Sequence, residues 1–221
     1  MSGENFKVLI NTPSFKMDTG GVSNHFLGLS RFLPENRVSF CYTGGLRDYN
    51  KLVVIPVYIY QYLKFIYRLI SYKPDIVHLN PSLCYDSVIR DGVFVLISKL
   101  FKKKAIVFWH GWKVDFEGKI ENKYTKIFKR VFNKSDGFII ISSHVIEKLR
   151  QWGFKQPVLK TSTKVDDYLI EGFEISKKER SGNILFLGRL EENKGIFEAL
   201  RAFQLVQKRF PELTLTYAGN G

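Results

Sequence analysis

The chain has 221 residues, 45% of them apolar and 25% charged, which is typical of a globular protein with at least one sizeable core. Its 34 basic and 21 acidic residues give a formal net charge of +13, and this excess favours an anionic partner such as nucleic acid, anionic lipid or a phosphorylated substrate. The N-terminal residues lead directly into an apolar strand, and the longest apolar run, residues 52–63, is too short for a transmembrane helix. We therefore expect neither a signal peptide nor a membrane span.

The cysteine and histidine spacings carry no metal or redox motif. Cys41 and Cys84 lie apart in apolar surroundings, which favours reduced thiols and a cytoplasmic protein. His144 and Glu147 lack the H-E-x-x-H spacing of a zinc-binding helix. We therefore expect no metal site.

Short apolar runs alternate with helical patterns along the first 165 residues. Continuous apolar runs are typical of parallel strands that are buried on both faces. Such runs predict strands at residues 6–11, 38–42, 73–80, 105–109, 136–143 and 157–164. The alternation predicts an α/β fold for residues 1–165, namely a Rossmann-like, doubly wound parallel sheet with helices between its strands.

Two adjacent glycines, Gly20 and Gly21, lie between the first strand and a helix expected at residues 22–33. Glycines at a strand-to-helix crossing allow a ligand to approach the backbone closely. A dinucleotide-binding fingerprint would need G-x-G-x-x-G directly after the strand, with an acidic residue about 20 positions further on. The sequence has neither feature, which disfavours a nicotinamide or flavin enzyme. His25, inside the helix, either reaches the ligand or packs against its neighbours.

Residues 52–72 are rich in tyrosine and phenylalanine, mostly at helical spacing. Pro56 is expected to separate a short extended piece from the helix proper. Such a stripe more often belongs to the core, and the alternative is an exposed apolar patch for a lipid-linked acceptor.

Polar side chains follow several of the expected strands. His110 comes directly after the strand at 105–109, and His78 and Asn80 lie at the end of the strand at 73–80. Because the carboxyl ends of parallel strands face the ligand crevice, His110 is the leading candidate residue of this domain. The alternative is a strand-end histidine bonded to a local carbonyl. Ser142, after another strand, lacks a G-x-S-x-G elbow, so a nucleophilic role is not expected.

Residues 121–134 form a basic, amphipathic pattern. Lys123, Lys126, Lys129 and Arg130 fall on one side of an expected helix whose other side is apolar. Such a helix can lie on an anionic membrane, which would place the protein at the inner face of the membrane. The alternative is an ordinary solvated helix face.

The last forty residues predict a strand, a helix and a second parallel strand. A polar linker at 166–181 precedes this unit, which spans 182–221. The turn after its first strand carries Arg189, and Lys194 lies at the helix start. Two cations beside free backbone N–H groups can bind a diphosphate, and the alternative is a solvated loop that happens to hold two cations.

The sequence of these forty residues resembles that of the retaining, GT-B-fold glycosyltransferases of family 4 (glycosyl transferases group 1). The shared signature is G-R-L at 188–190, K-G at 194–195, A-F at 202–203, Pro211, and A-G-x-G at 218–221. The Gly20-Gly21 loop and the K-P-D-I-V-H run at 73–78 are similar to elements of the N-terminal domain of that family. The resemblance implies a GT-B N-terminal domain at 1–165 and the start of a second Rossmann-like, nucleotide-sugar-binding domain at 182–221.

The resemblance implies transfer of a sugar from a nucleotide-diphosphate sugar to a glycan or lipid-linked acceptor, with retention, in cell-surface polysaccharide biosynthesis, and without a metal or other cofactor. It implies donor-diphosphate binding by Arg189, Lys194, Gly20 and Gly21, and a catalytic role for His110 near the donor sugar. It places on the acceptor side His25, His78, Asn80 and Ser142. Asn80 stands where a second histidine is common in the family.

The family continues after A-G-x-G with a nucleotide-base pocket and an E-x7-E motif, and these 221 residues contain neither. We therefore expect the second domain to be incomplete. One alternative function is a catalytically silent, acceptor-binding fragment. A second is a basic nucleic-acid-binding protein, against which stands the lack of helix-turn-helix, zinc or RNP-type motifs, so we expect no nucleic-acid partner.

Overall fold

The computed structural model describes residues 5–15, 21–44, 51–164, 167–174 and 182–220. It divides the chain into two units, Met1–Asp166 and Asp167–Gly221, and each is described here by itself. The expected linker at 166–181 contains a short 3-10 helix, η2 (Asp167–Leu169), in its described part. No helix in the described ranges is long and apolar enough to cross a membrane.

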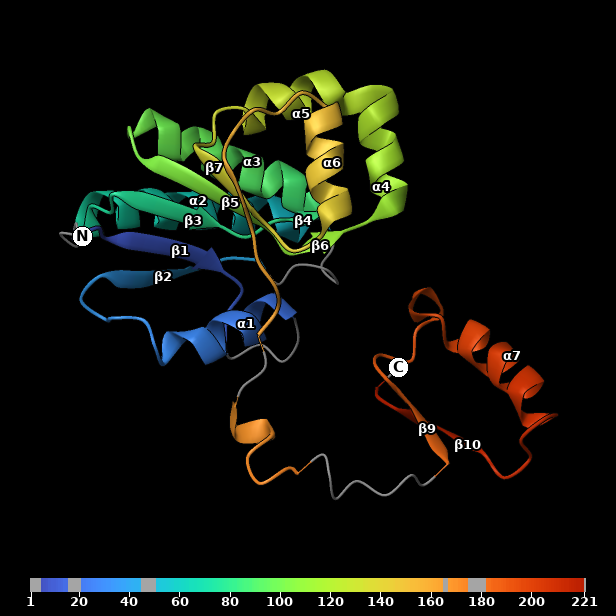
Figure 1. The fold of residues 1–221 in the computed structure, drawn as a ribbon. Helices are drawn as coiled ribbons and strands as arrows, with labels where there is room; N and C mark the ends of the chain where they lie inside the picture. Colours follow the sequence, from blue (N-terminus) through green and yellow to red (C-terminus); the bar gives the residue numbers. More distant parts are fainter. Residues whose placement is uncertain (1–4, 16–20, 45–50, 165–166, 175–181, 221) are drawn as a thin grey trace. The chain divides into compact units, whose positions relative to one another are not determined.

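The first unit is built around a six-stranded sheet in which every neighbouring pair is parallel (Figure 1). The strand order is β2-β1-β3-β5-β7-β8. The Rossmann-like α/β fold predicted from the alternating pattern is thereby confirmed. The strands are β1 (Val8–Thr12), β2 (Val38–Tyr42), β3 (Ile76–Leu79), β5 (Lys104–Trp109), β7 (Gly137–Ile140) and β8 (Val158–Lys160).

The helices between these strands cover the two faces unequally. Only the β1-to-β2 connection runs toward one edge of the sheet, and all later connections run toward the other. Because crossovers between parallel strands are right-handed, the helix of the first connection lies on one face and the later helices on the opposite face. Figure 1 shows α1 across the sheet from α3, α5 and α6. The helices are α1 (Gly21–Ser30), α2 (Lys51–Tyr72), α3 (Tyr85–Leu100), α5 (Thr125–Phe132) and α6 (Ser143–Gln151).

The main core lies between the sheet and the layer of α2, α3 and α5. Phe65 of α2 and Phe94 of α3 are both fully buried, and their ring centroids are 4.7 Å apart. Helix α2 runs unbroken through Pro56, so the expected extended piece before it is wrong. The missing N–H of Pro56 costs one hydrogen bond near the start of a 22-residue helix, and the later turns hold their packing against the core.

The basic segment at 121–134 is not one regular helix. It lies in a π-helical turn η1 (Ile120–Tyr124) and in α5, which continue end to end from α4 (Val114–Lys119). The hydroxyl of Thr125 donates to the carbonyl of Ile120 across 2.7 Å and caps the widened turn. A π turn accommodates one extra residue, which keeps the buried side chains of the three pieces on one side. These side chains are Phe116, Ile120, Phe128 and Phe132.

A second, two-stranded sheet was not expected from the sequence. It pairs β4 (Ser82–Leu83) with β6 (Gly111–Trp112), directly after the carboxyl ends of β3 and β5. A Cβ at position 111 would lie 2.7 Å from Oγ of Ser82, so the close pairing requires glycine there. The small sheet fixes the exit path of the chain from both strands.

The second unit contains the expected strand, helix and parallel strand. These are β9 (Asn183–Leu187), η4 (Glu192–Lys194), α7 (Ile196–Gln207) and β10 (Thr214–Ala218). Gly195 has φ +80°, the left-handed conformation that joins η4 to α7. A Cβ at Gly219 would lie 1.7 Å from the carbonyl oxygen of Gly188. The local backbone therefore requires glycine at positions 195 and 219. No residue between 182 and 220 is buried.

Candidate ligand site at the carboxyl edge of the sheet

The strand order reverses between β1 and β3. The chain leaves β1 for β2 on one side and returns to β3 on the other, so these two strands flank the point where the order reverses. Ligands of open α/β sheets bind at such a point, beyond the carboxyl ends of the strands. Asn11 and Thr12 end β1, and Asn80 and His110 follow β3 and β5.

Asn80 links these strand ends through both atoms of its side-chain amide. Its Nδ2 donates to the carbonyl oxygen of Asn11 across 2.8 Å, and its Oδ1 lies 3.0 Å from Nε2 of His110. A backbone carbonyl only accepts, so the amide orientation is determined and Oδ1 must be the acceptor toward His110. Nε2 of His110 therefore carries the proton, and Nδ1 is left with a free lone pair.

Three histidines gather around the rings of Phe26 and Phe108. His25 of α1 lies 5.2 Å from His110, and Phe108 lies 3.7 Å from His110, between ring centroids. His78 of β3 approaches Phe26 at 5.6 Å. Helix α1 thus places His25 against the rings of Phe108 and His110, at the edge where β5 ends, which fits both the packed and the ligand-facing alternative.

Burial keeps all three imidazoles neutral. It is the main cause that lowers the pKa of His110 to about 3 and that of His78 to about 4, and neighbouring histidines lower both further. Burial also lowers the pKa of His25, with a smaller contribution from the charge of Lys164. At neutral pH the three imidazoles can therefore donate hydrogen bonds to a ligand and accept them from it without carrying a positive charge.

Several buried polar atoms at this edge have no hydrogen-bond partner among the described residues. They include Nδ2 of Asn11, Oγ1 of Thr12 and Nδ1 of His78. Asn11 and Thr12 are almost fully buried, and Oδ1 of Asn11 accepts a short hydrogen bond from the hydroxyl of Thr43. Unpaired buried polar atoms are rare in proteins, and each calls for a partner such as an ordered water, an ion or a ligand. No pattern in the sequence marks these residues, because Asn11 and Thr12 end an apolar run.

Ser142 and Gly21 make no hydrogen bond or ring contact with this cluster among the described residues. Ser142 is exposed at the N-cap of α6, where its side chain makes no capping hydrogen bond. Gly21 begins α1, and an added Cβ there would meet nothing within 4 Å, so local packing does not require glycine. Gly20 lies outside the described residues. The structure therefore brings together His25, His78, Asn80 and His110.

A second polar cluster, centred on Glu117, was missed by the sequence analysis. The buried Glu117 accepts from Nε1 of Trp112 at 2.5 Å and lies 3.1 Å from both His144 and Lys148. Burial alone would raise the pKa of Glu117, but these hydrogen bonds outweigh it and lower the pKa. Lys148 also pairs with Glu121 at 2.8 Å. These contacts join α4 and η1 to α6.

The second unit carries, on adjacent turns, the two side chains that are predicted to bind a diphosphate. Arg189 follows β9, and its Nη1 lies 2.6 Å from the carboxylate of Glu191, with the side chain about half exposed. Lys194 is exposed at the end of η4, one residue before the N-cap of α7. An incoming phosphate can bind the other N–H groups of Arg189 or compete with Glu191 for Nη1.

No protein-family model matches the chain, and no curated protein matches it in sequence. The function is therefore argued from the geometry of the two units.

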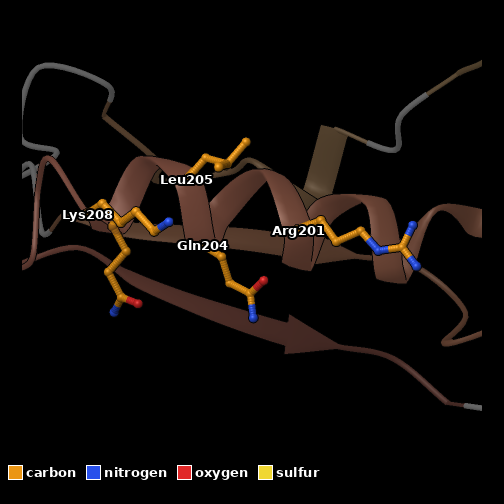
Figure 2. Close-up of a pocket in the computed structure, with 5 residues that line it drawn as sticks. Arg201, Gln204, Leu205 and Lys208 are labelled. Atoms are coloured by element: carbon orange, nitrogen blue, oxygen red, sulfur yellow. The ribbon is translucent and has the colours of Figure 1, made fainter.

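A hollow of about 580 Å³ on the second unit does not coincide with the predicted ligands. All of its lining residues come from one helix, α7 or its end, and Figure 2 shows the labelled side chains spreading apart rather than converging. They are Arg201, Gln204, Leu205, Gln207 and Lys208. A surface made by a single helix face offers no enclosure for a ligand. Within the described ranges, no three His, Cys, Asp or Glu side chains are grouped to hold a metal ion.

Proposed function

We propose that the protein is a retaining glycosyltransferase that moves a sugar from a nucleotide-diphosphate sugar to a hydroxyl of a glycan or lipid-linked acceptor, in cell-surface polysaccharide biosynthesis. The observation that carries the proposal is the pairing of Asn80 with His110, which holds a neutral imidazole in one tautomer where the strand order reverses. The sequence signature at 188–221 supports the same reaction.

A neutral His110 suits the charge that develops during glycosyl transfer. The transition state of such reactions has oxocarbenium character at the anomeric carbon. A protonated imidazole beside that carbon would repel it, whereas the free Nδ1 of neutral His110 accepts a hydrogen bond from a hydroxyl of the donor sugar. Asn80 acts by positioning His110, and does not itself need to touch the sugar.

The unpartnered atoms beside His110 provide contacts for the acceptor. Nδ2 of Asn11 donates, the hydroxyl of Thr12 can both donate and accept, and Nδ1 of His78 donates or accepts according to the tautomer of its ring. A sugar hydroxyl can both donate and accept, so it satisfies such a mixed set. His25 closes the same cluster from α1.

In this proposal the second unit stabilises the negative charge that develops on the departing diphosphate. Arg189 and Lys194 supply two cations, and the first backbone N–H groups of the 12-residue helix α7 add their positive dipole end. These groups act in place of a metal ion or cofactor. As the bond from the anomeric carbon to the diphosphate breaks, the acceptor oxygen bonds to that carbon and its proton passes to a phosphate oxygen.

A thermal-shift and calorimetric screen of the full chain against UDP-, GDP- and ADP-sugars tests the proposal. One donor is expected to raise Tm, and both Arg189→Ala and Lys194→Ala should abolish the increase. Lys208→Ala removes an exposed cation from the far end of the same unit and should respond like the unaltered chain. Failure of every donor to bind, or binding that survives both substitutions, would contradict the donor site.

A catalytically silent, acceptor-binding module is the second candidate, favoured by the lack of any buried residue between 182 and 220. This candidate predicts that an acceptor glycan binds the chain while no sugar-nucleotide does. In that case His110→Ala should weaken glycan binding, and Arg189→Ala should leave it unchanged.

A further inference from the structure

Helix α2 is apolar on the side that faces solvent as well as on the side that faces the core. Its inner side buries Phe65 and Leu69. On its outer side, five large apolar side chains follow one another at intervals of three or four residues, and each is more than half exposed. They are Ile55, Ile59, Leu63, Tyr67 and Ile70. A helix at the surface of a soluble protein ordinarily has one apolar stripe, so a second one indicates another environment.

The exposed apolar surface continues onto the neighbouring helix. Helix α3 packs beside α2, and its outer side carries apolar residues that are between 40% and 78% exposed. These are Tyr85, Ile89, Leu96 and Leu100. The outer sides of α2 and α3, defined by these four residues and the five of α2, are named the α2–α3 surface.

The charges around this surface are mainly positive. Helix α2 contains no acidic residue, and Lys64 lies along it, whereas Arg68 turns toward β2 and donates a hydrogen bond to Ser39. Helix α3 contains two acids, of which Asp91 is buried and paired with Arg90, so Asp86 alone is exposed. Beyond α3 in the same layer, α5 and η1 expose Lys123, Lys126 and Arg130.

This combination of apolar, aromatic and basic side chains fits one kind of partner. Anionic lipid headgroups attract the cations, the aliphatic side chains enter the boundary with the acyl chains, and tyrosines are enriched at that depth. A second copy of the chain fits less well, since a symmetric contact would bring Lys64 against its own copy in a protein of net charge +13.

We propose that the α2–α3 surface binds the face of an anionic lipid bilayer, with α2 lying in the interface. The principal contact is therefore α2 and not the segment 121–134, in which α5 exposes Ile127 as its large apolar side chain and supplies mainly charge. This inference does not depend on the proposed glycosyl transfer.

Co-sedimentation of the full chain with vesicles tests the inference. We expect binding to vesicles of phosphatidylcholine that contain phosphatidylglycerol, and at least tenfold weaker binding to pure phosphatidylcholine. Ile59→Ser combined with Leu63→Ser should weaken binding to the anionic vesicles at least tenfold. Because both residues are exposed, the variant should keep its circular-dichroism spectrum and Tm. Leu205→Ser removes an equally exposed leucine from α7 and should bind like the unaltered chain.

Three results would overturn the inference. The first is a lack of binding to anionic vesicles, and the second is unchanged binding by the Ile59→Ser, Leu63→Ser variant. In the second case, loss of binding in Lys126→Glu with Arg130→Glu would assign the contact to α5 alone. The third is a dimer of the unaltered chain in analytical ultracentrifugation that the same apolar double variant converts to a monomer, which would assign the surface to a second copy.

Discussion

Oδ1 of Asn80 accepts a hydrogen bond from Nε2 of His110 across 3.0 Å, while Nδ2 of the same amide donates to the backbone of β1. One side chain therefore connects the ends of three adjacent strands. It also selects a tautomer, because an amide held by a backbone carbonyl cannot turn its N–H groups toward the imidazole.

Asn80→Asp should raise the pKa of His110. A carboxylate in place of the amide oxygen stabilises the protonated imidazole, and an opposite charge at this range shifts a pKa by about 1 to 3 units. The change is measured by NMR titration of the histidine ring protons, starting from a pKa of about 3 in the unaltered chain. Asn80→Leu, which brings no charge, is the matched control. An unchanged His110 in Asn80→Asp would show that the two side chains do not interact in solution.

Stability should fall on acidification from pH 6.5 toward pH 4. His78 and His110 have folded pKa values of about 4 and about 3, below the unfolded value of 6.5, so the unfolded chain binds more protons in this range. Each therefore contributes stability that is complete above pH 6.5 and is lost as pH falls, at a limiting slope of about 1.4 kcal/mol per pH unit. Urea unfolding at a series of pH values measures the slope. His110→Gln should make it shallower, and an equal slope in that variant would refute the assignment.

Phe94→Ala should destabilise the first unit by about 3 to 5 kcal/mol, because Phe94 is fully buried against Phe65 and its removal leaves a cavity. Leu100→Ala, at an exposed site on the same helix, should change the free energy of unfolding by less than about 0.5 kcal/mol. Chemical denaturation followed by circular dichroism compares the two. Similar losses in both variants would place Phe94 outside the cooperative core.

Backbone amides of β9 and β10 should exchange with solvent much faster than those of β5. No side chain between 182 and 220 is buried, and two strands with one helix give little protection. Residues of β5, in contrast, lie between β3 and β7 in the core sheet. Hydrogen-exchange mass spectrometry of the full chain measures both in one experiment. Equal protection of β9 and β5 would indicate that the second unit is stabilised by contacts outside itself.

The sequence predicts the central sheet well because buried parallel strands are uniformly apolar. The strand expected at 105–109 differs from β5 by one residue, since most of its side chains are buried on the two faces of the sheet. The β4–β6 pair was missed because two residues are too few to show a pattern. Pro56 was misjudged because a rule for isolated helices does not include the packing of α2 on the core.

The candidate site could be predicted only in part. His78, Asn80 and His110 follow from the rule for strand ends, which depends on chain order alone. The unpaired atoms of Asn11 and Thr12 could not be foreseen, because which buried polar atoms find partners depends on the three-dimensional packing. The Glu117 cluster could not be predicted because the π turn η1 changes the direction in which the side chains before and after it point. A helical wheel that assumes a regular α-helix assigns these directions wrongly.

The π turn at Ile120–Tyr124 has a consequence for how this protein can change over generations. Deleting one exposed residue within the turn, such as Asn122, would let α4 and α5 close into a regular α-helix with Ile120 and Phe128 still facing inward. The same deletion inside α3 would rotate everything after it by about 100° and expose its buried side. Differences in chain length between this protein and its relatives should therefore accumulate at η1 and be rare within α3.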